Sequence, residues 1–206
     1  MSLSRSLVGT LTVLVFGGPA LAVEPLDPAV TVSRPDWTVE QLVVLLKEQR
    51  EPVVSFEEAT YSSLLTEPLF VQGILRFTPP ATLEKEVRAP YHERYVIDGD
   101  RVLFESARKG IKKTISLDDY PALRSFVDAF RASLTGDVAR LKQRYETTVD
   151  GDRRQWTLLL RPLEPSGKSV VDYILFSGAG GRIDSIAIRA PDGDRSVMTL
   201  RRGTSR

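Results

Sequence analysis

The chain has 206 residues, no cysteine, one histidine and a formal net charge of +1. Without Cys there is neither a disulfide framework nor a thiolate ligand, and a single His is too few for a Cys/His zinc site. We therefore expect no metal and no cofactor. Such balanced charge provides no basic surface for nucleic acid, which we exclude as a partner.

The first residues have the organisation of a secretory signal. Arg5 precedes an uncharged, mostly apolar run, and Ala20-Leu21-Ala22 supplies the small residues of a cleavage site. The run is too short and too weakly apolar for a membrane span of ~20 residues. We expect a signal peptide at 1–22, a Pro-rich leader at 23–36 and one soluble domain at 37–206. Loss of Arg5 reduces the 28 basic residues to 27, equal to the 27 acidic ones.

The first periodic segment predicts a helix at residues 37–50. Leu42, Leu45 and Leu46 fall on one helical face, and Pro52 ends the pattern. Beyond it the period changes to two, which is typical of strands.

Alternating residues between Pro and Asp-Gly breaks predict two groups of strands. The first group is expected at residues 53–61, 69–77, 82–88, 94–97, 101–106 and 111–117. The second is expected at residues 144–149, 154–161, 170–176, 182–189 and 196–201. About eleven antiparallel strands of this kind curl toward a barrel or half-barrel.

Between the two groups, residues 118–136 predict an amphipathic helix, with a short further helix after it. Leu123, Phe126, Val127 and Phe130 recur at spacings of three and four as one apolar stripe. The stripe has two interpretations. It fills an ordinary core, which the residue types alone favour, or it forms a lid over an apolar cavity.

No catalytic pattern accompanies these elements, so we expect a binding protein rather than an enzyme. His92 has no G-x-S-x-G motif to complete a hydrolase site. The glycine-rich segment 177–181 is not followed by the helix that a phosphate site requires, and predicts a hairpin turn. Adjacent Glu57 and Glu58 point to opposite faces of a strand and cannot act together. A hydrolase using Ser and His92 is kept as an alternative, which an unaffected His92→Ala variant would remove.

Several short features of the first half occur together in a recognisable order. They are Ser55-Phe56, Gly73, Pro80, Leu83, Ala89-Pro90, Asp98-Gly99, Val102 and Phe104. Over residues 37–104, behind a signal peptide and without Cys, this order resembles the periplasmic lipoprotein-carrier family, the LolA-like proteins. The later helix and strands agree with that family in order only.

The resemblance implies an α+β fold in which about eleven antiparallel strands form an unclosed half-barrel. About three helices would cover its concave side as a lid. It also implies a periplasmic monomer whose cavity holds the acyl chains of lipoproteins or related lipids. The cargo would come from an inner-membrane transporter and pass to an outer-membrane acceptor, without a chemical reaction.

The resemblance also favours the lid interpretation and suggests which residues contact the cargo. The candidate lipid-binding residues are Phe56, Leu75, Phe77, Leu83, Val87, Leu123, Phe126, Val127 and Phe130. In the family an Arg before the break Pro holds the lid, but here that position is Pro79, so no latch residue is predicted. The cargo stays open between a lipoprotein and a glycolipid or other lipid. The alternative function is a periplasmic adaptor or envelope-assembly component of a lipid export system, with the concave face filled by its own side chains.

Overall fold

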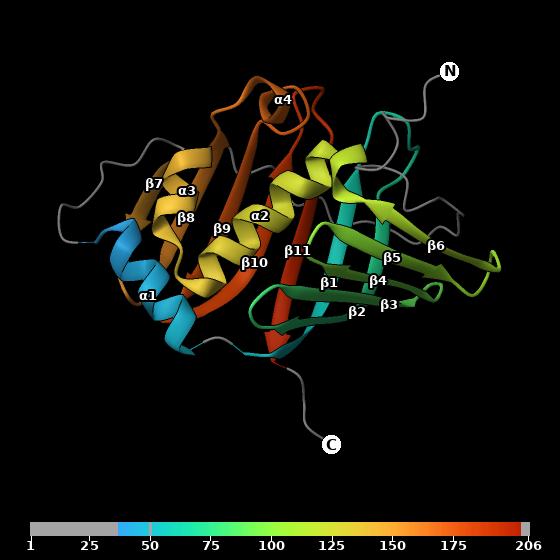
Figure 1. The fold of residues 1–206 in the computed structure, drawn as a ribbon, viewed down its shortest axis with the longest axis horizontal. Helices are drawn as coiled ribbons and strands as arrows, with labels where there is room; N and C mark the ends of the chain where they lie inside the picture. Colours follow the sequence, from blue (N-terminus) through green and yellow to red (C-terminus); the bar gives the residue numbers. More distant parts are fainter. Residues whose placement is uncertain (1–36, 50, 203–206) are drawn as a thin grey trace.

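The computed structural model describes residues 37–49 and 51–202, so the expected signal peptide (1–22) and leader (23–36) lie outside the described residues. One antiparallel sheet runs in the order β6-β5-β4-β3-β2-β1-β11-β10-β9-β8-β7 (Figure 1). Its edge strands, β6 and β7, do not pair with each other, so the sheet curves into an open half-barrel. The predicted fold class is confirmed.

The strands follow the expected period-2 segments closely. They are β1 Val53–Tyr61, β2 Leu69–Thr78, β3 Thr82–Ala89, β4 Glu93–Asp98, β5 Arg101–Ser106, β6 Ile111–Ser116, β7 Tyr145–Gly151, β8 Trp156–Pro162, β9 Tyr173–Ala179, β10 Arg182–Arg189 and β11 Arg195–Arg202. Pairing of β1 with β11 joins the two groups, with Phe56 opposite Leu200. The first and last strands of the chain therefore form the centre of the sheet.

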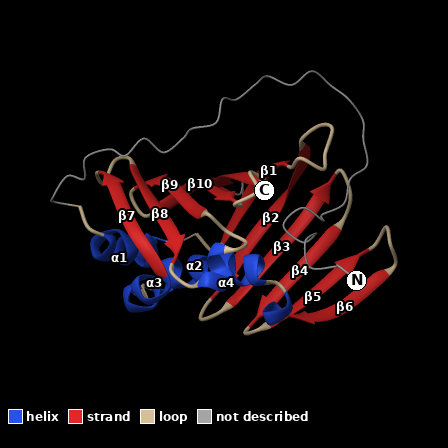
Figure 2. Ribbon diagram, turned by 90° about the horizontal axis from the view of Figure 1, so that it is seen from above, coloured by secondary structure: helices blue, strands red, loops and turns tan. Residues whose placement is uncertain are grey.

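The described residues contain four α-helices and one 3-10 helix, where about three helices were expected. They are α1 Val39–Gln49, η1 Leu117–Asp119, α2 Pro121–Thr135, α3 Val138–Arg144 and α4 Pro165–Lys168. All lie on the concave side of the sheet, as Figure 2 shows. The sequence missed α4, which is only four residues long.

Most predicted boundaries differ from the structure by at most two residues, and two predicted starts are wrong by three. The helix expected from residue 118 begins at Pro121, because the Ser116 hydroxyl accepts a hydrogen bond from the Asp118 N–H and so closes η1 as a separate turn. The strand expected from residue 170 begins at Tyr173, because the Val170 and Val171 N–H groups donate to the Gly167 carbonyl at the end of α4.

The core lies between the concave face and the helices. Side chains of α1, including Leu42 and Leu46, are fully buried and pack with α2, α3 and β7. Trp156, on β8, is the largest fully buried side chain, and its indole N–H donates to the Gly180 carbonyl at 2.8 Å. This half of the concave face is therefore closely filled.

Gly73 marks a close approach of two strands. The register between β2 and β3 shifts there, and a Cβ atom at this position would lie 1.9 Å from the Glu86 carbonyl oxygen and 3.0 Å from the Phe56 ring. A side chain at position 73 would force the backbone of β3 or the Phe56 ring to move. Close packing of β2 against β3 and Phe56 thus explains why the family-like pattern has a glycine at position 73.

Candidate functional site: a cavity under the start of helix α2

An apolar cavity of about 160 Å³ lies between the concave face and the first two turns of α2. Its walls come from strands β1 to β4, β10 and β11, and its roof comes from α2. The lining residues are Glu58, Thr60, Leu69, Val71, Leu75, Leu83, Lys85, Tyr95, Ile97, Ala122, Leu123, Phe126, Ile186, Ile188, Ser196 and Met198. A cavity of ~150 Å³ holds one benzene molecule. At this volume the space fits only part of an acyl chain.

Four of the nine candidate lipid-binding residues line this cavity: Leu75, Leu83, Leu123 and Phe126. The other five are buried deeper in the core or beside the cavity, and they are Phe56, Phe77, Val87, Val127 and Phe130. Period-2 and helical spacing identified the inward face correctly. They carry no information on where along that face the space opens.

Helix α2 has two parts with different surroundings. We call residues 121–126 the roof half and residues 127–135 the core half. Phe130 is 3% exposed, and its ring lies 6.3 Å from Phe77 and 6.4 Å from Phe176, centroid to centroid. Phe126 is only partly buried and lies over the cavity, with its ring 5.7 Å from that of Phe130. The core half fills the half-barrel, whereas the roof half covers a space.

Two arginines of α2 attach it to the β4–β5 turn. Arg131 donates from Nη1 to the Gly99 carbonyl at 2.8 Å and from Nη2 to the Ile97 carbonyl at 3.3 Å. Arg124 forms ion pairs with Asp100 at 3.0 Å and with Asp118 at 2.8 Å. No latch residue was predicted, because the position of the family arginine is Pro79 in this chain. Here the arginines that tether the helix belong to α2 itself.

A polar group that the prediction missed is set into the apolar wall. Lys85 of β3 forms an ion pair with Glu58 of β1, and the Ser196 hydroxyl of β11 donates to the other Glu58 oxygen at 2.6 Å. Burial favours the neutral acid, but the charge and hydrogen bond of Lys85, together with Ser196, hold the pKa of Glu58 below its ordinary value. The signals in the sequence were two charged residues at inward positions of the alternation, Glu58 after Phe56 and Lys85 between Leu83 and Val87.

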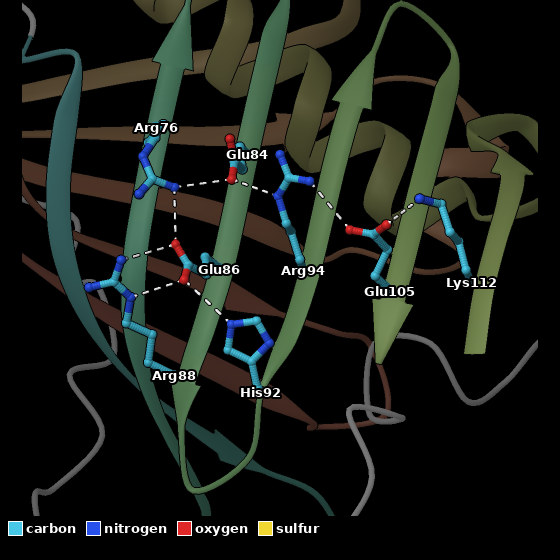
Figure 3. A network of polar contacts seen from close by, with 8 residues as sticks. All are labelled: Arg76, Glu84, Glu86, Arg88, His92, Arg94, Glu105 and Lys112. Carbon is cyan, nitrogen blue, oxygen red and sulfur yellow. Dashed lines mark hydrogen bonds and ion pairs between the residues drawn. The ribbon is translucent and has the colours of Figure 1, made fainter. Parts of the chain in front are cut away.

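The convex side of β2 to β6 carries a ladder of ion pairs instead of a site, as Figure 3 shows. Its members are Arg76, Glu84, Glu86, Arg88, His92, Arg94, Glu105 and Lys112. Hydrogen bonds from Arg88, which outweigh the effect of burial, and from Arg76 lower the pKa of Glu86 to about 2. The His92 Nε2 atom lies 3.5 Å from a Glu86 oxygen, and its side chain is 56% exposed. His92 is thus placed at the end of this ladder, on the face opposite the cavity.

A second hollow, of about 770 Å³, lies on the convex face of the central strands. Phe70, which is 59% exposed, and Val197, which is 36% exposed, contribute to its lining together with Tyr61 and Leu175. Arg195 lies over the Tyr61 ring, 4.2 Å from its centroid. The lining of this groove is more polar than that of the cavity under α2.

Over residues 37–49 and 51–202, no group of three or more His, Asp or Glu side chains is arranged to hold a metal ion. Within the same ranges, the helices are all too short or too polar to cross a bilayer.

Comparison with known proteins shows to which family the chain belongs. The family model described as outer membrane lipoprotein carrier protein LolA-like matches residues 33–206. No curated protein matches the chain.

Among solved structures, a LolA superfamily protein from Nitrosomonas europaea is 10% identical, with a TM-score of 0.44, covering 80% of this chain and 92% of that one. An uncharacterized conserved protein from Thermus thermophilus is 9% identical, with a TM-score of 0.46, covering 81% and 88%. A putative outer membrane lipoprotein-sorting protein domain from Vibrio parahaemolyticus is 10% identical, with a TM-score of 0.41, covering 81% and 93%. The family match spans most of the chain, and the protein belongs to the LolA-like outer membrane lipoprotein carrier family.

Proposed function

We propose that the protein is a periplasmic carrier that holds acyl chains of lipoproteins or related lipids under the roof half of α2. It shuttles them from an inner-membrane transporter to an outer-membrane acceptor without a chemical reaction. The observation that carries this proposal is the apolar cavity roofed by Leu123 and Phe126. Membership in the LolA-like family supports a carrier role in general.

The size of the cavity implies that the roof half moves when cargo enters. A space of about 160 Å³ is too small for a whole acyl chain. Each buried CH₂ group contributes ~0.8 kcal/mol to binding. A carrier must also release its cargo, so opening a tethered roof provides a route for both entry and delivery. Breaking the contact of Arg124 with Asp100 of the β4–β5 turn is the corresponding movement.

Analysis of the exported protein tests this proposal directly. The full chain is expressed with its expected signal, purified from periplasm without detergent, and examined by native mass spectrometry and lipid extraction. We expect a mature chain that begins at Val23 and carries acyl lipids. A protein that is always empty and also fails to bind a pyrene-labelled fatty acyl ester, the acyl probe, would refute the carrier function.

The groove on the convex face favours a second candidate function, an adaptor or envelope-assembly component that binds another protein. Its exposed Phe70 and Val197 form an apolar surface away from the cavity. The two functions differ in the role of Phe126. In an adaptor whose concave face is merely packed, Phe126→Asp unfolds the protein. In a carrier, the same variant stays folded and loses the acyl probe.

A further inference from the structure

The polar group in the cavity wall limits the chemical class of the cargo. Glu58, Lys85 and Ser196 come from three different strands, and all three line a mainly apolar space whose other polar side chains are Thr60 and Tyr95. The Lys85 and Glu58 side chains are 20% and 14% exposed, and an ion pair so largely buried contributes little net stability, because desolvation of the two charges offsets their attraction. Apolar residues at these positions would close the half-barrel equally well. The pair therefore suggests a role toward whatever occupies the cavity.

The hydrogen bonds within this group use both Glu58 oxygens as acceptors but only one N–H group of Lys85 as a donor. The two Glu58 oxygens accept from Lys85 and from Ser196. The Lys85 ammonium has three N–H groups. One donates to Glu58, and the Phe56 ring lies 5.1 Å from Nζ. Among the described residues the ammonium has no other hydrogen-bond partner, although it lines the cavity.

An occupant made only of hydrocarbon would leave this donor unsatisfied once the roof closes and water is excluded. Leaving such a buried group unsatisfied weakens binding, and it does so more strongly when the group is charged. An occupant with an acceptor oxygen removes that cost. The cargo should therefore bring a carbonyl or carboxylate oxygen to Lys85, with its chain along Leu75 and Leu83.

The charge of the pair distinguishes between these two oxygens. Lys85 and Glu58 together are neutral, so a carboxylate bound at Lys85 would add an unbalanced negative charge inside an apolar cavity. It would also lie close to the Glu58 carboxylate, where like charges repel. An ester or amide carbonyl accepts the same hydrogen bond and adds no charge.

We propose that Lys85 donates a hydrogen bond to the carbonyl oxygen of a neutral acyl ester or amide, and that Glu58 discriminates against free fatty acids. This inference rests on the carrier function and specifies its substrate class. It places the acyl linkage, rather than the chain end or a charged headgroup, at the wall formed by β1, β3 and β11. Ester-linked and amide-linked chains share this chemistry.

Competition for the acyl probe tests the inference with four ligands of equal chain length: methyl laurate, N-methyl lauramide, laurate and dodecane. With the wild-type mature protein, the ester and the amide should displace the probe about tenfold better than laurate or dodecane, a difference of ~1.4 kcal/mol. A preference for only one of the two carbonyl ligands identifies the linkage. Equal displacement by all four ligands would overturn the inference and leave the carrier function standing. Absence of probe binding would instead contradict the carrier function.

Two variants test the roles of the individual groups. Glu58→Gln removes the negative charge but keeps an acceptor for Lys85, and should reverse the preference in favour of laurate. The double variant Glu58→Gln/Lys85→Met avoids an unpaired buried charge on the protein, and should bind the ester, the amide and dodecane alike and laurate most weakly, because no cation is left to balance the carboxylate. Glu84→Gln and Lys112→Met make the same substitutions on the convex face and should retain the wild-type preference. An unchanged preference for the ester in a folded Glu58→Gln protein, checked by circular dichroism, would contradict the role assigned to Glu58.

Discussion

The two halves of helix α2 carry one continuous apolar stripe but meet different surroundings. In the core half, Val127 is fully buried, and Phe130 packs between the rings of Phe77 and Phe176. In the roof half, Leu123 and Phe126 are partly buried and cover open space. The two interpretations of the stripe, plug and lid, thus apply to different parts of one helix. A helix anchored at one end can move its other end without unfolding the core.

The largest expected effect is the loss of the anchor. Phe130→Ala removes a nearly fully buried ring and leaves a cavity, which should destabilise the protein by ~3–5 kcal/mol. The free energy of unfolding is measured by urea denaturation followed by circular dichroism. A loss below ~1 kcal/mol would mean that the core half is not closely packed.

The matched change in the roof half should act on binding instead. Phe126→Ala removes a partly buried ring over a space that is already open, so we expect a stability loss of at most ~2 kcal/mol. Its affinity for the acyl probe should fall about tenfold, because the chain loses the aromatic surface above it. If Phe126→Ala and Phe130→Ala cost the same stability, the division of α2 into two halves is wrong.

The tether of the roof should control exchange rather than stability. Arg124→Met, in the roof half, removes the partly exposed ion pair with Asp100 of the β4–β5 turn, a contact worth ~0.2–1 kcal/mol. We expect release of the acyl probe to become about threefold faster in stopped-flow measurements, since ~1.4 kcal/mol corresponds to tenfold. Arg88→Met, on the convex face, is the control. An unchanged release rate in Arg124→Met would show that this contact does not hold the roof.

The smallest effect concerns the convex ladder, which lies far from both halves of α2. The pKa of Glu86 is lowered from 4.5 to about 2, so its ion pairs stabilise the fold fully above pH 4.5, and this contribution is lost as the pH falls toward about 2. Because the ladder is solvent-facing, Glu86→Gln should cost only ~0.5–1 kcal/mol near neutral pH. Urea midpoints of the two proteins should converge on acidification. A difference between the two urea midpoints that grows at low pH would contradict the lowered pKa of Glu86.

The sequence contained enough to predict the sheet. The alternation in β1 to β3, the Asp98-Gly99 turn and the change of period at α2 each depend on residues that are neighbours in the chain, so a single sequence is enough to predict them. The division of α2 into two halves does not depend on neighbouring residues. It depends on where the helix crosses the sheet, so Leu123 and Phe130 were assigned to the same role.

The polar group in the cavity could not be predicted for a similar reason. Glu58 and Ser196 are 138 residues apart and meet only because β1 pairs with β11. The alternation of β1 predicts that Glu58 points inward, but it does not identify the partners of Glu58. The alternation of β3 likewise predicts that Lys85, between Leu83 and Val87, points inward. A search for charged residues at apolar positions of the alternation would have found both, without the serine.

Hydrogen–deuterium exchange along α2, with and without the acyl probe, tests the central claim most directly. In the empty protein, the roof half should exchange faster than the core half, because it covers a space rather than filling one. Binding of the probe should slow exchange in residues 121–126 and in the β4–β5 turn, and leave residues 127–135 unchanged. Uniform exchange along the helix, or equal protection of both halves by the probe, would contradict a carrier with an anchored, movable roof.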